Sequence, residues 1–242
     1  MGRAIAAEAK TKDNLKIVCG VDISECKDAD FPVYKSLAEV KEDADIIVDY
    51  SHHSTIFDVL CAAKTRKIPA VIATTGHTDS EISAINEASG EIAIFRTGNM
   101  SLGVNLLMSL AKEAASMLGI DYNIEIIEKH HNQKLDAPSG TAIMIANAIA
   151  EATPFEPNYV YDRHGERKKR APEDIGIHSV RGGGIVGEHE VIFAGEKEVL
   201  TISHSAADRS LFSSGTLRAV EFMYGKKSGM YSMDDYIKSL KK

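Results

Sequence analysis

Apolar and polar positions alternate in blocks along the first hundred residues. Short apolar runs have the length of buried strands, whereas longer runs with apolar positions on one side are typical of amphipathic helices. The predicted strands cover residues 15–21, 45–50, 69–73 and 92–95. The predicted helices cover residues 3–10, 36–42, 55–67 and 79–88.

This alternation predicts a parallel sheet that is covered by helices on both faces, so we expect a Rossmann-like, doubly wound α/β domain. In such sheets ligands bind beyond the carboxyl ends of the strands. Four short polar segments follow predicted strands and would lie at this edge: Asp22, residues 51–53, residues 74–76 and residues 97–99.

The pattern changes after residue 101. A long helix is predicted over 102–118, followed by a strand over 123–128 and a helix over 140–151. Glycines then separate three strand candidates, over 175–180, 188–193 and 198–203. These segments predict an α+β domain with an antiparallel, meander-like or mixed sheet.

Amphipathic helices are predicted over 210–224 and 233–240, and they could pack back onto the first domain. We therefore expect one domain over residues 1–101 and 211–242, with a dinucleotide-binding fold. The second domain would cover residues 102–210.

Composition narrows the class of protein. The chain has 242 residues, 44% of them hydrophobic, and can bury a sizeable core. Its net charge of −7 is spread along the sequence, which argues against a nucleic-acid partner, and the dense basic run over 163–170 is expected to be a solvated loop. Apolar runs are too short to cross a bilayer, and the N-terminus does not resemble a signal peptide. We expect a cytoplasmic protein without a membrane partner.

Neither the cysteines nor the histidine pair predicts a metal site. Cys19, Cys26 and Cys61 lack the CxxC spacing of zinc ligands, and their number does not favour a disulfide framework. His52 and His53 have no carboxylate or cysteine at ligand spacing, so a solvated loop is the better interpretation.

Asp22 ends a predicted strand, where a carboxylate in a dinucleotide-binding fold can accept hydrogen bonds from ribose hydroxyls. A simple turn or helix cap would also place an aspartate there. The chain opens directly on a helix, so we expect it to begin inside the phosphate-binding turn, without the first strand and most of the glycine-rich loop.

Ionisable side chains are crowded between residues 128 and 134. Lys129, His130, His131 and Lys134 follow a predicted strand, and mutual repulsion would lower their pKa values. Such groups could bind an anion or donate a proton near neutral pH. A small dicarboxylate would satisfy them.

The segment that follows, Asp136-Ala137-Pro138-Ser139-Gly140-Thr141, leads into a strong helix pattern. It places backbone amides and hydroxyls at a helix N-terminus, where a carboxylate can bind. The alternative is that Ser139 only caps the helix and that the lysines are solvated.

The segment EKHHNQKLDAPSGTA, over residues 128–142, resembles the signature of the 4-hydroxy-tetrahydrodipicolinate reductase (dihydrodipicolinate reductase) family. The segments VIATTG, GNMSLGVN and SVRGGGIVGEHEV are also similar to family segments and occur in the same order. The resemblance covers essentially the whole chain.

The resemblance implies roles for individual residues. His130 would be the catalytic proton donor or acceptor, and Lys134 would donate a proton to the substrate. His131, Gly140 and Thr141 would bind the substrate carboxylates. The cofactor would contact the remaining site residues: Met1, Gly2, Asp22, Ala73, Thr74, Thr75, Thr97, Gly98, Asn99 and Met100.

The resemblance also implies the activity: reduction of 4-hydroxy-tetrahydrodipicolinate to tetrahydrodipicolinate with NADH or NADPH, in diaminopimelate and lysine biosynthesis. It implies a homotetramer, with the polar sheet of the second domain as the interface. Ile23 stands where many relatives have an arginine able to pair with the 2′-phosphate of NADPH, so we expect NADH to be used at least as well.

Two other functions are compatible with this organisation. A related amino-acid dehydrogenase could share the two-domain plan, but it would not account for the turn KLDAPSGT. A noncatalytic or cofactor-impaired protein could keep the fold, and titration with NADH would distinguish it from the enzyme.

Overall fold

The structure is a computed structural model that describes residues 1–26, 28–165 and 167–241. It consists of two compact units. Unit 1 comprises Met1–Met100 and Ser210–Lys242, and unit 2 comprises Ser101–Arg209.

A parallel sheet of four strands, in the order β11-β5-β4-β3, forms the centre of unit 1. Its strands are β3 (Ile47–Asp49), β4 (Ala70–Ile72), β5 (Ala93–Arg96) and β11 (Gly229–Tyr231). The α-helices of the unit are α1 (Gly2–Ala9), α2 (Ile56–Arg66), α3 (Asp79–Ala88), α6 (Ser210–Met223) and α7 (Met233–Leu240). The prediction of a Rossmann-like α/β fold is confirmed.

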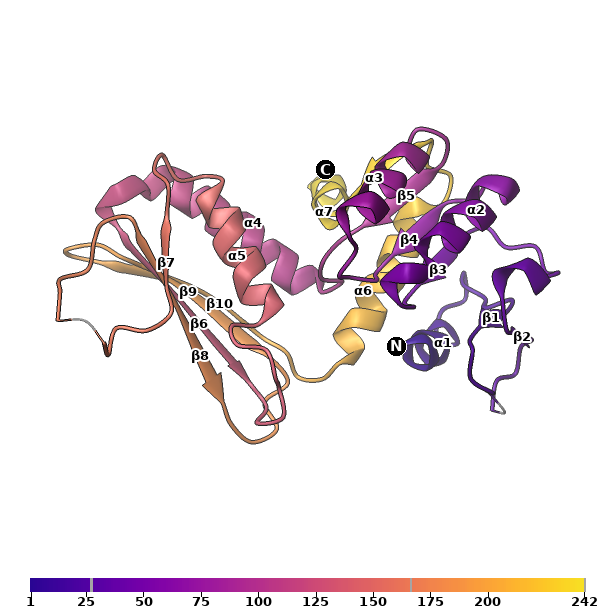
Figure 1. Cartoon of the computed structure of the whole chain (residues 1–242), viewed down its shortest axis with the longest axis horizontal. Helices are drawn as coiled ribbons and strands as arrows, with labels where there is room; N and C mark the ends of the chain where they lie inside the picture. Colours follow the sequence, from indigo (N-terminus) through magenta and orange to yellow (C-terminus); the bar gives the residue numbers. More distant parts are fainter. Residues whose placement is uncertain (27, 166, 242) are drawn as a thin grey trace. The chain divides into compact units, whose positions relative to one another are not determined.

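Both faces of this sheet are buried, because successive side chains of a strand point to opposite faces. Ile72 and Ile94 pack with side chains of α2 and α3 in one apolar cluster. Val48 packs on the other side with Ile5 of α1 and Leu217 of α6. Figure 1 shows α2 and α3 on one side of the strands and α6 on the other.

Two predictions for the first part of the chain are wrong. Residues 15–21 form a strand only at β1 (Gly20–Val21), which pairs with β2 (Val33–Tyr34) in a separate parallel sheet. Leu15 and Ile17 still pack against the cluster around α1, so their burial explains the apolar run without strand pairing. Residues 36–42 form only the short 3-10 helix η1 (Leu37–Glu39), because the backbone is already extended at Val40.

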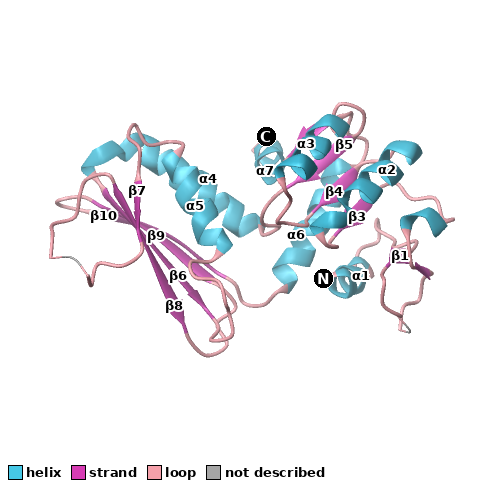
Figure 2. Ribbon diagram, in the orientation of Figure 1, coloured by secondary structure: helices cyan, strands magenta, loops and turns pink. Residues whose placement is uncertain are grey.

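Unit 2 contains a mixed sheet of five strands in the order β10-β9-β6-β8-β7. These strands are β6 (Asn123–His130), β7 (Asn158–Val160), β8 (Asp174–Arg181), β9 (Glu188–Ala194) and β10 (Val199–Ser205). The helices α4 (Leu102–Leu118) and α5 (Gly140–Ala150) cover one face, as Figures 1 and 2 show. Ile126, Ile145 and Phe193 are fully buried in the core between the helices and the sheet.

The expectation of a mixed sheet is confirmed, whereas a purely antiparallel meander is wrong. β9 is antiparallel to β6 and β10, but β6 pairs with β8 in parallel and β8 pairs with β7 in parallel. A parallel pair requires a long crossover, and α5 lies in the connection between β6 and β8. The sequence pattern did not predict β7 or β11, each of which has three residues.

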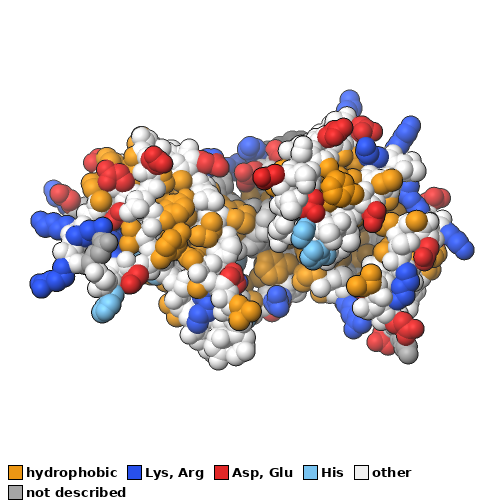
Figure 3. Space-filling view, in the orientation of Figure 1, with side chains coloured by type: hydrophobic (Ala, Val, Ile, Leu, Met, Phe, Trp, Pro, Cys, Tyr) orange, Lys and Arg blue, Asp and Glu red, His pale blue; other side chains and the backbone are white. Residues whose placement is uncertain are grey.

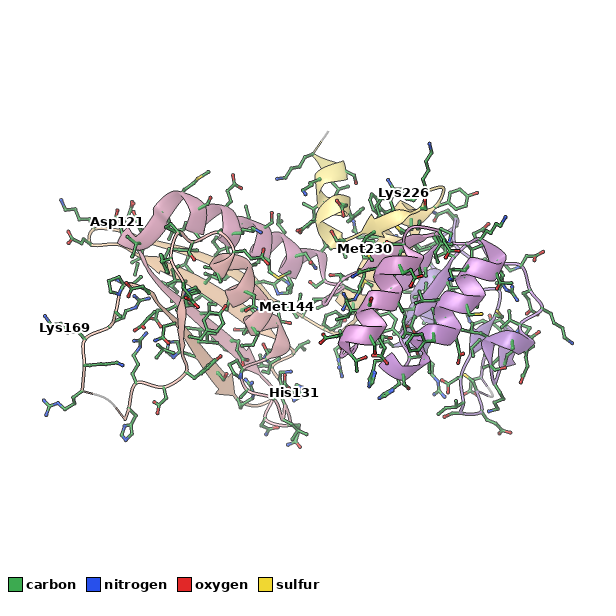
Figure 4. All side chains as sticks on the ribbon, turned by 45° about the horizontal axis from the view of Figure 1, so that its top comes forward. Asp121, His131, Met144, Lys169, Lys226 and Met230 are labelled. Carbon is green, nitrogen blue, oxygen red and sulfur yellow. The ribbon has the colours of Figure 1, made fainter. Side chains whose placement is uncertain are left out.

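The loop between β7 and β8 carries the basic run. Figure 4 labels Lys169 on this loop, and Figure 3 shows basic side chains at the same end of unit 2. The described residues of this run are exposed, as expected for a solvated loop, except Arg170, which is partly buried. Arg163 and Arg170 both donate to the carboxylate of Glu125 on β6, at 2.7 and 3.1 Å, and Arg170 also donates to backbone carbonyls. Residue 166 lies outside the described residues.

Candidate active site

The turn between β6 and α5 carries the predicted catalytic side chains. His130 is the last residue of β6 and is 8% exposed, Lys134 lies within the turn, and Gly140 is the first residue of α5. Figure 4 labels His131 on this turn. The fold therefore brings the predicted proton-transfer and carboxylate-binding residues to one end of the sheet in unit 2.

The N-terminus of α5 begins at a capping residue. Ser139 Oγ accepts a hydrogen bond from the Ala142 amide at 3.1 Å, which is the capping role considered in the sequence. The ion pair with Lys134, helped by the nearby Gly140 amide, lowers the pKa of Asp136, so an anionic group is already stable beside this end of the helix. The positive end of the helix dipole, with Thr141 in the same turn, suits a carboxylate ligand.

The expected lowering of the pKa is wrong for Lys129, and both lysines of this segment are paired with carboxylates of the chain. Lys134 Nζ lies 2.9 Å from Asp136 Oδ1, and Lys129 Nζ lies 3.0 Å from Glu188 Oε2. The hydrogen bond and the charge of Glu188 raise the pKa of Lys129 instead of lowering it. Lys129 also points away from the turn, since alternate residues of β6 face opposite sides of the sheet.

Glu128 is a site residue that the sequence did not reveal. It is completely buried beneath the turn. Its Oε2 accepts from His130 Nδ1 at 2.6 Å and from Arg181 at 2.7 Å. Its Oε1 accepts from the same guanidinium at 2.7 Å and from the Ser139 amide at 3.1 Å.

These donors keep Glu128 ionised in spite of its burial. Burial alone raises the pKa of the carboxyl, but hydrogen bonds from Arg181, Ser179, His130 and the Ser139 amide outweigh it and bring the pKa to about 2. The hydrogen bonds to Glu128, together with its charge, in turn raise the pKa of Arg181. The site therefore contains a permanent buried ion pair below His130.

Two further histidines continue this polar layer across the sheet. His189 pairs with Glu128 in the β6–β9 register and with His204 in the β9–β10 register. Its ring meets that of His130 edge to face with centroids 5.2 Å apart, and its Nε2 lies 3.2 Å from Ser139 Oγ. Burial, together with the nearby His130, lowers the pKa of His189 to about 4, so His189 is neutral near pH 7.

A cavity in unit 1 lies at the carboxyl ends of β3 and β4. Its volume is about 360 Å³. Its lining residues are Tyr50, Ser51, His52, His53, Ala73, Thr74 and Thr75. Three of the predicted cofactor-binding residues therefore lie in one cavity, at the edge where Rossmann-like sheets bind nucleotides. Threonine hydroxyls and loop amides suit the ribose and amide groups of a nicotinamide nucleotide.

Asp22 follows β1 and is exposed, and its Oδ1 accepts from the Ser24 amide at 2.7 Å. This is the turn-forming role that the sequence left open. Ile23 is 89% exposed. Lys35, which follows β2, donates from its ammonium group to the Ile23 carbonyl at 2.9 Å. The pairing of β1 with β2 thus brings a cation to the acidic strand end, and the sequence alone did not indicate this.

The other predicted cofactor residues lie at the N-terminus of α1 and after β5. Met1 precedes α1, and Gly2 has open space where a side chain would be. Thr97 follows β5, and its hydroxyl donates to the Asn99 carbonyl at 3.0 Å, which holds the turn containing Gly98. Met100 is buried, at 3% exposure.

The histidine pair beside the cavity is tied to the protein. His53 Nδ1 lies 3.0 Å from a carboxylate oxygen of Glu81, and the His52 side chain accepts from the Ser54 amide. Within the described residues, no group of three histidine, cysteine, aspartate or glutamate side chains is placed to hold a metal ion. The same part of the chain has no helix that is both long and apolar enough to span a membrane.

Unit 1 is a helix-covered parallel sheet with a cavity at its carboxyl edge, and unit 2 places a capped helix beside titratable side chains. This combination is typical of two-domain, nucleotide-dependent oxidoreductases. The family model described as "Dihydrodipicolinate reductase, N-terminus" matches residues 1–100, and the model of the C-terminus matches residues 103–237. The chain belongs to the dihydrodipicolinate reductase family, which confirms the resemblance seen in the sequence.

Individual relatives agree with this assignment. The 4-hydroxy-tetrahydrodipicolinate reductase of Caldanaerobacter subterraneus subsp. tengcongensis is 53% identical over 98% of this chain and 94% of its own length. The enzyme of the same name from Clostridium tetani is 44% identical over 99% of this chain and 93% of its own length. A dipicolinate-bound dihydrodipicolinate reductase from Paenisporosarcina sp. TG-14 superposes with a TM-score of 0.79, at 27% identity, over 96% of this chain and 92% of that protein.

Proposed function

We propose that this protein reduces 4-hydroxy-tetrahydrodipicolinate to tetrahydrodipicolinate with a nicotinamide cofactor, as a step of diaminopimelate and lysine biosynthesis. The observation that carries the proposal is the turn after β6, which sets His130 and Lys134 beside the N-terminus of α5. The names of the relatives support the reaction, and the dipicolinate-bound structure supports a small dicarboxylate ligand.

Unit 2 supplies the groups that bind the substrate and transfer the proton. His131, together with the Gly140 and Thr141 amides at the N-terminus of α5, would bind the carboxylates. The 4-hydroxyl group and one ring proton would leave together as water, which gives a dehydrated, unsaturated ring. As this ring accepts the hydride, Lys134, assisted by His130, would donate the proton that completes the reduction. Asp136, 2.9 Å from Lys134 Nζ, would keep the ammonium group oriented.

Unit 1 would bind the cofactor, which supplies the hydride. Ala73, Thr74 and Thr75 line the cavity and would hold the nicotinamide half together with Thr97, Gly98, Asn99 and Met100. Asp22 would accept from the ribose hydroxyls of the adenosine half, and Met1 and Gly2 would meet the phosphates at α1.

Steady-state assays of site variants test the reaction assignment. Replacing Lys134 or His130 with alanine should lower kcat by about 10²–10⁴-fold, because each removes a proton-transfer group. Lys112→Ala is the control: this exposed lysine of the same unit pairs with Glu151 on the helices, so kcat should stay within about threefold of the wild type. Equal activity of Lys134→Ala and Lys112→Ala would contradict the proposed roles.

For the cofactor, we propose that NADH is used at least as well as NADPH, because Ile23 cannot pair with a 2′-phosphate. The ammonium group of Lys35 donates to the Ile23 carbonyl, so Lys35 would be the cation that contacts the 2′-phosphate of NADPH. Lys35→Ala should raise KM for NADPH by about tenfold and leave KM for NADH unchanged. Lys64→Ala, which removes an exposed lysine of α2 paired with Glu91, should change neither value. A strong NADPH preference of the wild type would contradict the proposal.

We further propose a homotetramer that assembles through the sheet of unit 2. In the described part of this unit, α4 and α5 cover one face of the sheet, and the opposite face carries exposed groups such as Val199 and the Lys129–Glu188 pair. A partly apolar sheet face of this kind can be buried by a second copy. Light scattering should give four times the chain mass.

A further inference from the structure

We propose that Glu128 is a positioning residue of the reductase: it fixes which nitrogen of His130 carries a proton and, with Arg181, anchors the turn that carries Lys134. This inference rests on the proposed function, because Glu128 would act on the reaction through His130 and the turn.

The hydrogen bonds of Glu128 leave its carboxylate no freedom to rotate. Each oxygen accepts two hydrogen bonds, one from the guanidinium of Arg181 and one from either His130 or the Ser139 amide. A carboxylate has about four lone-pair positions, so these four hydrogen bonds fill them, and the neighbouring Ser179 hydroxyl adds to the stabilisation of the charge. Because the side chain is fully buried, water cannot replace these donors.

An ionised carboxylate can only accept hydrogen bonds, so the Nδ1 of His130, 2.6 Å from Glu128 Oε2, must carry the hydrogen. In the neutral imidazole, Nε2 is then the nitrogen that can accept a proton. A side chain at Gly187 would begin 3.1 Å from this Nε2, so the glycine keeps the space beside it open. The geometry makes Nε2 the proton-exchanging atom of His130.

The same ion pair ties the turn to the sheet. Arg181 also donates to the Asp136 carbonyl at 2.7 Å, and the Ser139 amide donates to Glu128 at the other end of the segment. The Asp136 side chain in turn holds Lys134 Nζ. Glu128 therefore positions His130 directly, and Arg181 positions Lys134 through Asp136.

Glu128→Gln tests the proposal, because the amide keeps the shape but offers one acceptor oxygen in place of two. We expect kcat to fall by about 10²-fold or more while KM for the substrate changes only a few-fold. In protein labelled with ¹⁵N-histidine, the His130 signals should change from a pure Nδ1–H tautomer to a mixture. The spectrum of His130→Ala identifies those signals.

Glu151→Gln is the matched control in the same unit. Glu151 is also ion-paired, 2.7 Å from Lys112, but the pair is exposed on the helices, so kcat and the His130 signals should not change. A Glu128→Gln enzyme with wild-type kcat would overturn the proposal. A loss of kcat with an unchanged tautomer would also overturn it, because the role of Glu128 would then be structural.

If Glu128→Gln does not fold, Arg181→Lys carries the test. Lysine keeps the charge beside Glu128 but cannot donate in the same planar pattern to the carboxylate and the Asp136 carbonyl. We expect the Nδ1–H tautomer to remain and KM for the substrate to rise by about tenfold; an unchanged KM would refute the anchoring role. The two proposals can fail separately. An inactive wild type would contradict the proposed function. The spectra require no turnover, so the tautomer measurement would still decide the role of Glu128.

Discussion

His189 shows how burial sets the protonation of a single residue in this site. Its pKa is about 4 in the folded protein, because burial and the neighbouring His130 oppose its charged form, against about 6.5 in the unfolded chain. Between these values the unfolded chain binds more protons than the folded protein. Keeping His189 neutral therefore contributes to the free energy of unfolding above pH 6.5. This contribution is lost as the pH falls towards 4.

This linkage predicts a change in pH dependence for His189→Gln. Between pH 7 and pH 5 the free energy of unfolding of the wild type should fall by about 2 kcal/mol because of His189. In the variant the free energy of unfolding should fall by that much less. Urea unfolding at the two pH values measures the difference. His164→Gln, at an exposed histidine of the β7–β8 loop, should behave like the wild type. Equal pH dependence of His189→Gln and the wild type would contradict a neutral, buried His189.

At the residue scale the sequence revealed the groups that stand together in the chain and missed those that meet through the fold. His130, Lys134 and Ser139 lie within one short segment, so their clustering was visible. Arg181 reaches Glu128 from a separation of 53 residues, through the pairing of β6 with β8. Lys35 reaches Ile23 through the pairing of β1 with β2. Strand partners are not encoded in local periodicity, so neither contact was predictable.

At the scale of elements, α6 supports the segment after β5. A methyl group on Gly215 would overlap the carbonyl oxygen of Met100, so the helix packs directly against the end of the predicted nicotinamide-binding segment. The glycine is needed for this close approach of two backbones.

Gly215→Ala should therefore destabilise the protein by about 1–3 kcal/mol, because the overlapping atom belongs to the backbone and cannot rotate away. Thermal unfolding measures the loss. Gly184→Ala is the control, because no atom lies within 4 Å of the position its side chain would take, and it should leave the melting temperature nearly unchanged. Equal melting temperatures of both variants would show that α6 can shift away from Met100.

Elements within a clear apolar pattern were predictable from the sequence, and the shortest elements without such a pattern were not. The structure has α3 and α4 at the predicted residues, because each has a clear apolar face and a capping side chain, Thr78 or Ser101. The strands β3 and β4 are as short as β7 and β11, but they lie within the apolar runs over 45–50 and 69–73, whereas β2, β7 and β11 belong to no predicted strand. Their existence depends on the neighbouring strand they pair with.

At the scale of the whole molecule, the central claim is that the chain transfers a hydride from a nicotinamide cofactor to the ring of a dicarboxylate. The family assignment, the cavity of unit 1 and the turn of unit 2 support this claim from separate parts of the chain. The claim concerns one chemical event, so it can be tested by following the transferred atom.

The most direct measurement uses NADH that carries deuterium at the transferring position of the nicotinamide, with substrate generated by the synthase. Mass spectrometry of the product should show tetrahydrodipicolinate with one added deuterium, formed at the rate of cofactor oxidation. Lys134→Ala should lower this rate by about 10²–10⁴-fold. Cofactor oxidation that does not depend on the substrate, or tetrahydrodipicolinate without the label, would contradict the proposed function.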